Sequence, residues 1–173
     1  MSIKGNAYPK TTWAFQERPV ASAKLNSWDD RIEAALELAY FLLAHAWGGG
    51  NGVVRGAAAA DLEVVAADTP ALHVLVQPGY AFIDRCPYKL AVETPTADVT
   101  PPVTNPRIDL VQARLATWDV SIKPGAEAAS PVAPAPDTDA IALAELYLRP
   151  GMTVIKNTDD ATNGYIIDAR TFL

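Results

Sequence analysis

Residues 107–125 read RIDLVQARLATWDVSIKPG, and this stretch decides the fold class. Its first part, RIDLVQARLAT, alternates apolar and polar side chains with the period of two that is typical of a β-strand. The apolar side chains fall on two sides of that strand: Ile108, Leu110 and Ala113 or Leu115 on one, and Val111 near the other. WDVSIKPG then predicts a returning strand that ends at a Pro-Gly turn. The stretch therefore predicts an antiparallel hairpin.

Similar short segments occupy most of the chain from about residue 60 onward, and Pro and Gly separate them. They are LEVVAA (62–67), LHVLVQPG (72–79), GYAFID (79–84), YKLAVE (88–93), IALAELYLRPG (141–151), MTVIKN (152–157) and GYIIDARTF (164–172). Two Pro-rich segments, 94–106 and 126–140, are expected to be loops. In the strand at 141–151 we expect two faces: Leu143, Glu145 and Tyr147 on one, and Ala142, Ala144, Leu146 and Leu148 on the other. Many short strands without intervening helices predict a mainly β protein, an antiparallel β-sandwich or barrel-like domain.

One amphipathic α-helix is expected before this domain, over residues 27–47. WDDRIEAALELAYFLLAHAW is rich in helix-forming residues. Asn26 or Ser27 suits the N-cap, and Asp29 and Asp30 then fall in the first turn, where negative charge favours the helix dipole. The glycines at 48–50 predict the end of the helix and a flexible joint.

Apolar residues repeat along this helix with alternating spacings of three and four. This heptad seam consists of Leu25, Trp28, Ile32, Ala35, Ala39, Leu42 and Ala46, and a second stripe of Leu36, Tyr40, Leu43 and Trp47 lies beside it. Together they form an apolar arc wider than a two-stranded coiled coil needs. The helix either packs on its own β domain, or it meets copies of itself around a symmetry axis and also contacts the body, and the small alanines favour close approach. We expect the second arrangement, a homo-oligomer and specifically a trimer.

The N-terminal residues 1–24 show no hydrophobic period, and Pro9 and Pro19 discourage helix. Trp13 and Phe15 are large apolar residues in a segment that cannot build its own core. The segment is either a disordered tail or an extended arm whose aromatic side chains dock on a neighbouring subunit or partner, and we expect the arm. The predicted organisation is thus an arm (1–24), an oligomerisation helix with its Gly-rich joint (25–52) and a β-sandwich domain (53–173).

The amino-acid composition limits the classes of molecule that the chain is expected to bind. The 173 residues include 14 Lys and Arg against 20 Asp and Glu, a net charge of −6, so neither nucleic acid nor an anionic membrane surface is an expected partner. No apolar run approaches the length of a membrane span, and the first residues lack the apolar core of a secretory signal. We therefore expect synthesis in the cytosol. A single cysteine leaves no internal disulfide.

Few residues suit nucleophilic catalysis. His45 lies in the apolar face of the predicted helix, where a cap or packing role is expected, and His73 alternates with Leu72 and Val74 on a predicted strand, where a partly solvated face is expected. Cys86 follows Arg85, which favours a lowered thiol pKa, but no histidine is near it in sequence. A structural role is expected for all three, because a catalytic triad needs a histidine held by a carboxylate.

Two groups that contain aspartates are candidate metal or acid–base sites. Asp159 and Asp160, with Asn157 and Asn163, offer oxygen ligands for Ca²⁺, but their spacing differs from that of an EF-hand and no glutamate closes the loop. A solvated turn is expected there. Arg107 and Asp109 point the same way from one strand and are expected to form an ion pair, locally or across strands or subunits. The sequence thus predicts no catalytic residue, no metal site and no cofactor.

Four segments in a fixed order carry a resemblance to a known family. They match a Pro-Gly-x-Ala-x-Ile strand, an Asn-Pro-Arg-Ile-Asp-Leu-Val strand, a Leu-Ala strand with a Gly turn, and a terminal Ile-x-Asp-x-Arg. The matching residues are Pro78, Gly79, Ala81 and Ile83; Asn105 to Val111; Leu143, Ala144 and Gly151; and Ile167, Asp168 and Arg170. In this order, over residues 60–170, they resemble the N-terminal structural domain of tailed-bacteriophage receptor-binding, tail-fibre and baseplate proteins.

The resemblance implies a β-rich virion domain, commonly trimeric, with no catalytic residues. Family members often continue into a large receptor-binding head, so a chain ending at Leu173 is expected to be a tail or baseplate adaptor that docks on neighbouring tail proteins. Its expected location is the virion. A head cement or decoration protein is one alternative. Others are a carbohydrate-binding module that uses Trp118, Tyr88 or Tyr147 to bind a host glycan, and a glycan hydrolase.

Overall fold

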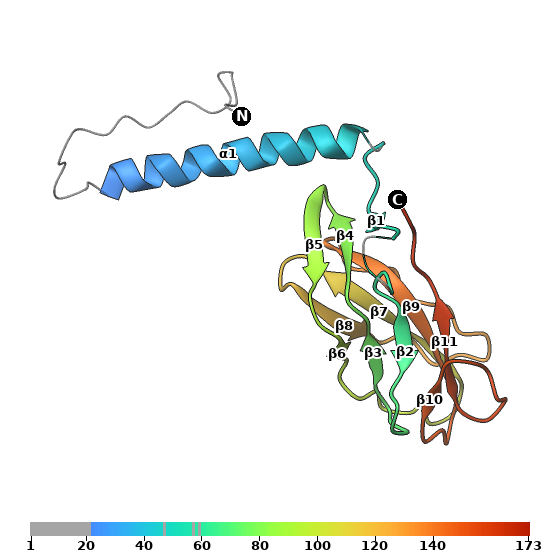
Figure 1. Ribbon diagram of the computed structural model, residues 1–173. Coiled ribbons are helices and arrows are strands. Elements are labelled where there is room, and N and C mark those ends of the chain that lie inside the picture. Colours follow the sequence, from blue (N-terminus) through green and yellow to red (C-terminus); the bar gives the residue numbers. More distant parts are fainter. Residues whose placement is uncertain (1–21, 47, 57, 59) are drawn as a thin grey trace. The chain divides into compact units, whose positions relative to one another are not determined.

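A computed structural model describes residues 22–46, 48–56, 58 and 60–173 (Figure 1). The chain divides into two compact units, residues 1–49 and residues 50–173. The described part of the first unit is a single α-helix, and the second unit contains three β-sheets. The protein is therefore mainly β, with one helix before a sandwich-like domain, as the sequence predicts.

The largest sheet has five strands in the order β10-β11-β9-β7-β8. Two three-stranded sheets, β1-β4-β5 and β2-β3-β6, complete the unit. The strands are β1 (Gly52–Val53), β2 (Val64–Ala66), β3 (Val74–Val76), β4 (Gly79–Ile83), β5 (Cys86–Leu90), β6 (Thr94–Pro95), β7 (Arg107–Arg114), β8 (Asp119–Lys123), β9 (Ala140–Leu148), β10 (Ile155–Lys156) and β11 (Gly164–Asp168). All neighbours pair antiparallel except the short pair β10 and β11, which is parallel.

One hydrophobic core joins the three sheets. Val53, Ile83 and Tyr88 come from the first small sheet, Val64, Val74 and Val76 from the second, and Val111, Leu143, Leu146 and Leu148 from the five-stranded sheet. The alternation of strand residues places these side chains on the inner faces. Their burial is what holds the sheets together, because apolar burial is the main favourable term in folding.

The predicted hairpin is confirmed as β7 and β8, with Arg114 opposite Asp119. Val111 and Ala113 face the core, whereas Leu110 and Gln112 lie on the other face and are nevertheless buried. The Pro-rich segment 126–139 covers that second face, since the Asp137 backbone N–H donates to Gln112 Oε1 at 3.0 Å and the Gln112 side chain donates to Asp137 Oδ2 at 2.6 Å. Both faces of β7 are buried, which explains why apolar residues occur on both sides of this strand.

The predicted faces of β9 are wrong at Leu143. A β-bulge opposite Val111 and Gln112 inserts an extra residue into β9, so that Leu143 and Ala144 both face the core. Glu145 and Tyr147 remain on the outer face, and Ala142, which was predicted on the core side, joins them there opposite Gln112. A bulge shifts the alternation by one residue, and neither Gly nor Pro marks its position in the sequence.

The predicted start of the helix is also wrong. The helix α1 spans Ser22–Ala46, about one turn earlier than the N-cap expected at Asn26 or Ser27, and no acidic residue lies in its first turn. Ala23, Lys24 and Leu25 are strong helix formers, so they extend the helix in preference to a cap at Ser27. The predicted arm 1–24 therefore overlaps α1 by three residues. Trp13 and Phe15 lie outside the described residues.

Candidate functional site

The exposed apolar face of α1 is the main candidate site. Large side chains on this helix are about half exposed: Leu25 46%, Trp28 47%, Leu36 47%, Leu38 41% and Leu43 39%. Ile32 and Ala35 of the predicted seam are partly buried and Ala39 is exposed. The side chains of Leu42, Ala46 and Trp47 lie outside the described part, although Leu42 and Ala46 belong to the helix. The seam therefore occupies one helix, as predicted, and the sequence reading missed Leu38.

Heptad positions show what this face can bind. With the seam at positions a and d, Lys24 occupies a g position and Asp29 the following e position. In a parallel coiled coil, a g residue faces the e residue five positions later on the next helix, so Lys24 and Asp29 are placed to pair between copies.

The second half of the helix carries leucines where the first half carries charges. Leu36 and Leu43 occupy e positions and Leu38 a g position, so the apolar surface widens toward the C-terminal end of α1. Each of these half-exposed leucines stabilises an assembly by about 1 kcal/mol when it is covered, since full burial contributes about 1.5–3 kcal/mol. A wide apolar face next to small Ala35 and Ala39 suits more than two helices around one axis.

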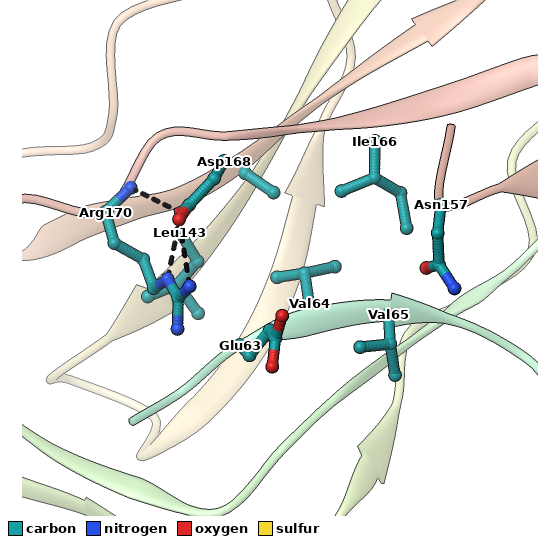
Figure 2. A pocket seen from close by; sticks show the side chains of 9 residues that line it. Glu63, Val64, Val65, Leu143, Asn157, Ile166, Asp168 and Arg170 are labelled. Atoms are coloured by element: carbon teal, nitrogen blue, oxygen red, sulfur yellow. Dashed lines mark hydrogen bonds and ion pairs between the residues drawn. The ribbon is translucent and has the colours of Figure 1, made fainter. Parts of the chain in front are cut away.

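A cleft of about 310 Å³ lies in the β unit and is lined by residues of β2, β9 and β11 (Figure 2). Val64, Val65 and Ile166 line its middle, and Glu63, Asp168 and Arg170 lie together at one end. No local pattern indicates this cleft, because its lining comes from segments about a hundred residues apart in the chain.

Arg170 is fully engaged at that end of the cleft. It donates to both carboxylate oxygens of Asp168 at 2.8 Å, and to the backbone oxygens of Ala60 and Asp61 at 3.0 and 3.1 Å. Arg170 lowers the pKa of Asp168, and Asp168 in turn raises the pKa of Arg170. The terminal Asp-x-Arg motif is thus a clamp that ties the end of β11 to the loop before β2.

The Arg-x-Asp motif of β7 has a comparable role and is more deeply buried. Arg107 donates from Nε and Nη2 to the two oxygens of Asp109 at 2.7 and 2.9 Å, which confirms the local ion pair. Asp109 is 1% exposed and also accepts the Gly125 backbone N–H at 2.9 Å. Arg107 reaches the Thr100 carbonyl oxygen at 2.8 Å. The pair therefore fastens two loops to the start of β7.

The acidic loop is a closed turn. Asp160 accepts the backbone N–H groups of Thr162 and Asn163, and Asn163 and Lys156 hold its pKa well below the usual range. Arg149 binds Asp159 at 2.9 Å and lowers its pKa in the same way. Within the described residues, no group of three or more His, Cys, Asp or Glu side chains is placed to hold a metal ion.

The remaining titratable candidates are two histidines and the cysteine. His73 Nδ1 lies 2.9 Å from Asp98 Oδ1 in an exposed position, and Cys86 lies partly buried at the start of β5. His45 belongs to α1, but its side chain lies outside the described part. Every carboxyl group of the described chain with a shifted pKa is shifted downward, which favours the ionised form that ion pairs and backbone N–H groups need.

The aromatic residues considered for glycan binding do not share one face. Tyr88 is 1% exposed, stacks on Trp118 with ring centroids 5.8 Å apart, and donates its hydroxyl to the Asp119 carbonyl oxygen. Tyr147 stacks instead on Tyr165. Tyr147 pairs with Ile108, six residues from the end of β7, which places it about 20 Å along the strand from the turn that carries Trp118.

No helix in the described part of the chain is long and apolar enough to cross a membrane. Comparisons with family models, with curated proteins and with solved structures found no match.

Proposed function

We propose that this chain is a structural protein of a tailed-phage virion, a tail or baseplate adaptor that self-associates through α1. The observation that carries the proposal is the apolar face of that helix. Five large side chains remain about half exposed on an element with heptad spacing. An exposed apolar surface of this kind marks a protein–protein contact.

The motif residues behind the phage resemblance support the same class of function. These motif residues form hydrogen bonds with one another and with backbone groups of nearby loops. They are Arg107, Asp109, Asp168 and Arg170. Residues that fasten loops stiffen a domain, and a stiff domain suits a role in which packing is the function. In the proposed mechanism, parallel α1 helices bring three copies together, the β units form the bulk, and the N-terminal segment docks on an adjacent protein.

Antibody labelling of virions tests the location. Antibodies against residues 50–173 are applied to purified particles of a phage that encodes the chain, and gold labelling is mapped by electron microscopy. Labels at the tail or baseplate support the proposal. Labels over the head would favour the cement alternative, and particles without label but with the chain left in the lysate would contradict a virion role.

A further inference from the structure

Strand β8 is an open edge of the five-stranded sheet. The Leu115 backbone N–H donates to Asp139, on the β9 side of β7. The backbone N–H and C=O groups of successive strand residues point to opposite sides of the strand. Those of Gln112 and Arg114 therefore point to β8, toward their partners Ser121 and Asp119. Val120 and Ile122 then present their N–H and C=O groups to the open side, where the described chain provides no hydrogen-bond partner.

A cleft of about 480 Å³ lies along this edge, between β8 and residues 97–100. Val99, Val120 and Ile122 give it an apolar wall, and the ion pair of Arg107 and Asp109 lies at its polar side. The inner faces of Val120 and Ile122 pack against the hydrophobic core, so the cleft opens directly onto the core. An extended chain added to β8 would satisfy the edge and fill the cleft with every second side chain.

The N-terminal segment has the sequence that this edge requires. Residues 11–16 read TTWAFQ, in which Trp13 and Phe15 alternate with Thr12, Ala14 and Gln16. Thr, Trp and Phe favour strands, and side chains two residues apart lie on the same face. Pro9 and Pro19 bracket the stretch, so a bound strand has defined ends.

Charge favours the same pairing. Residues 1–21 have three basic and one acidic side chain, a net charge of +2, whereas residues 50–173 have nine basic and fifteen acidic side chains, a net charge of −6. Lys10 and Arg18 flank the hydrophobic stretch, and Asp98, whose side chain is 73% exposed, lies at the cleft. Complementary charge of this kind guides association and fixes orientation.

We propose that residues 11–16 of one copy add as a strand to the open edge of β8 in a neighbouring copy, with Trp13 and Phe15 entering the cleft beside Val120 and Ile122. This rests on the proposed self-association, and it identifies what the arm binds.

Disulfide trapping in the full chain tests the pairing. In a Cys86→Ser background, one chain carries Ala14→Cys and a second, longer-tagged chain carries Ser121→Cys, because both positions fall on the outer face of the added strand pair. The two are co-expressed and oxidised. The matched control replaces Ser121→Cys with Thr162→Cys, which is exposed next to β10, at the opposite edge of the same sheet. We expect a disulfide-linked product of one chain of each length with Ser121→Cys and little with Thr162→Cys.

Proline at the edge separates strand addition from simple proximity. Val120→Pro removes a backbone N–H that points away from β7, so the hydrogen bonds between β7 and β8 remain. Val120→Ala is the control, because it also removes the valine side chain but keeps that N–H. We expect Val120→Pro to lower the cross-linked yield about tenfold relative to Val120→Ala, since an edge without its donor cannot accept the strand in register. Circular dichroism verifies that each variant is folded.

Each outcome decides the question. An oligomer that forms normally but cross-links no better at Ser121→Cys than at Thr162→Cys would refute the edge pairing and leave self-association intact. A cross-link within the Ala14 and Ser121 double variant of one chain, with none between chains, would refute the exchange between copies. A chain that stays monomeric and does not cross-link would refute the proposed assembly as well.

Discussion

Asp109→Asn is expected to destabilise the β unit strongly. The Asp109 side chain is 2% exposed and that of Arg107 15%, so the change leaves a nearly buried guanidinium without its counter-charge. Removing one partner of a buried pair costs about 3–5 kcal/mol. The asparagine oxygen still accepts the Gly125 N–H, which places the expected loss at the lower end, about 3 kcal/mol. That loss corresponds to a fall in Tm of about 10–15 °C for a unit of this size.

The matched control is Asp168→Asn in the second ion pair of the resemblance. The Arg170 side chain is only 12% exposed, but that of Asp168 is 55% exposed, so water screens the carboxylate charge. Arg170 also keeps its hydrogen bonds to the backbone oxygens of Ala60 and Asp61 after the change, so the expected loss is smaller, about 1 kcal/mol. Urea unfolding followed by circular dichroism measures both variants. The Arg107→Gln single variant and the Arg107→Gln, Asp109→Asn double variant complete a double-mutant cycle with Asp109→Asn. Equal losses for the two asparagine variants, or a coupling energy near zero between Arg107 and Asp109, would refute the reasoning.

Three further predictions concern the tyrosine, a glycine and the arm. Burial, followed by the nearby Asp119, raises the pKa of Tyr88 to about 12. Because Tyr88 then ionises first in the unfolded state, the stability that it contributes below pH 10 is lost as the pH rises from about 10 to 12. The Tm measured over this range should therefore fall less in Tyr88→Phe than in the control Tyr80→Phe, which changes an exposed tyrosine. Gly79→Ala places a Cβ against the backbone nitrogen and side chain of Leu62, and urea unfolding should show a loss of about 1–3 kcal/mol; an unchanged midpoint would contradict this close approach. Deleting residues 1–21 should preserve the β circular-dichroism signal and the cooperative melt; unfolding of the deleted chain would mean that the arm belongs to the core.

The sequence predicted the elements that depend on local pattern. The hairpin of β7 and β8, the short strands between Pro and Gly, and a helix followed by glycines all arise from periodicity and turn chemistry. The ion pair of Arg107 and Asp109 was also predictable, since side chains two residues apart share a face of a strand.

The rest depended on contacts between distant segments. The bulge at Leu143 is set by the pairing of β9 with β7, and the second buried face of β7 by the crossing segment that contacts Gln112. The clefts bring together strands such as β2 and β11 that no local pattern links. The early start of α1 shows strong helix formers extending a helix beyond a plausible cap.

The mass of the full chain, with and without a charge in the helix seam, tests the central claim most directly. Ile32 occupies an a position, so Ile32→Glu places like charges around a shared axis, whereas Glu37→Gln on the exposed polar face is the matched control. At micromolar concentration, sedimentation equilibrium should give about three times 18.4 kDa for the wild type and for Glu37→Gln. Ile32→Glu should give 18.4 kDa with the thermal melt of the β unit retained. A monomeric wild type, or an Ile32→Glu variant with the wild-type mass, would contradict assembly through α1.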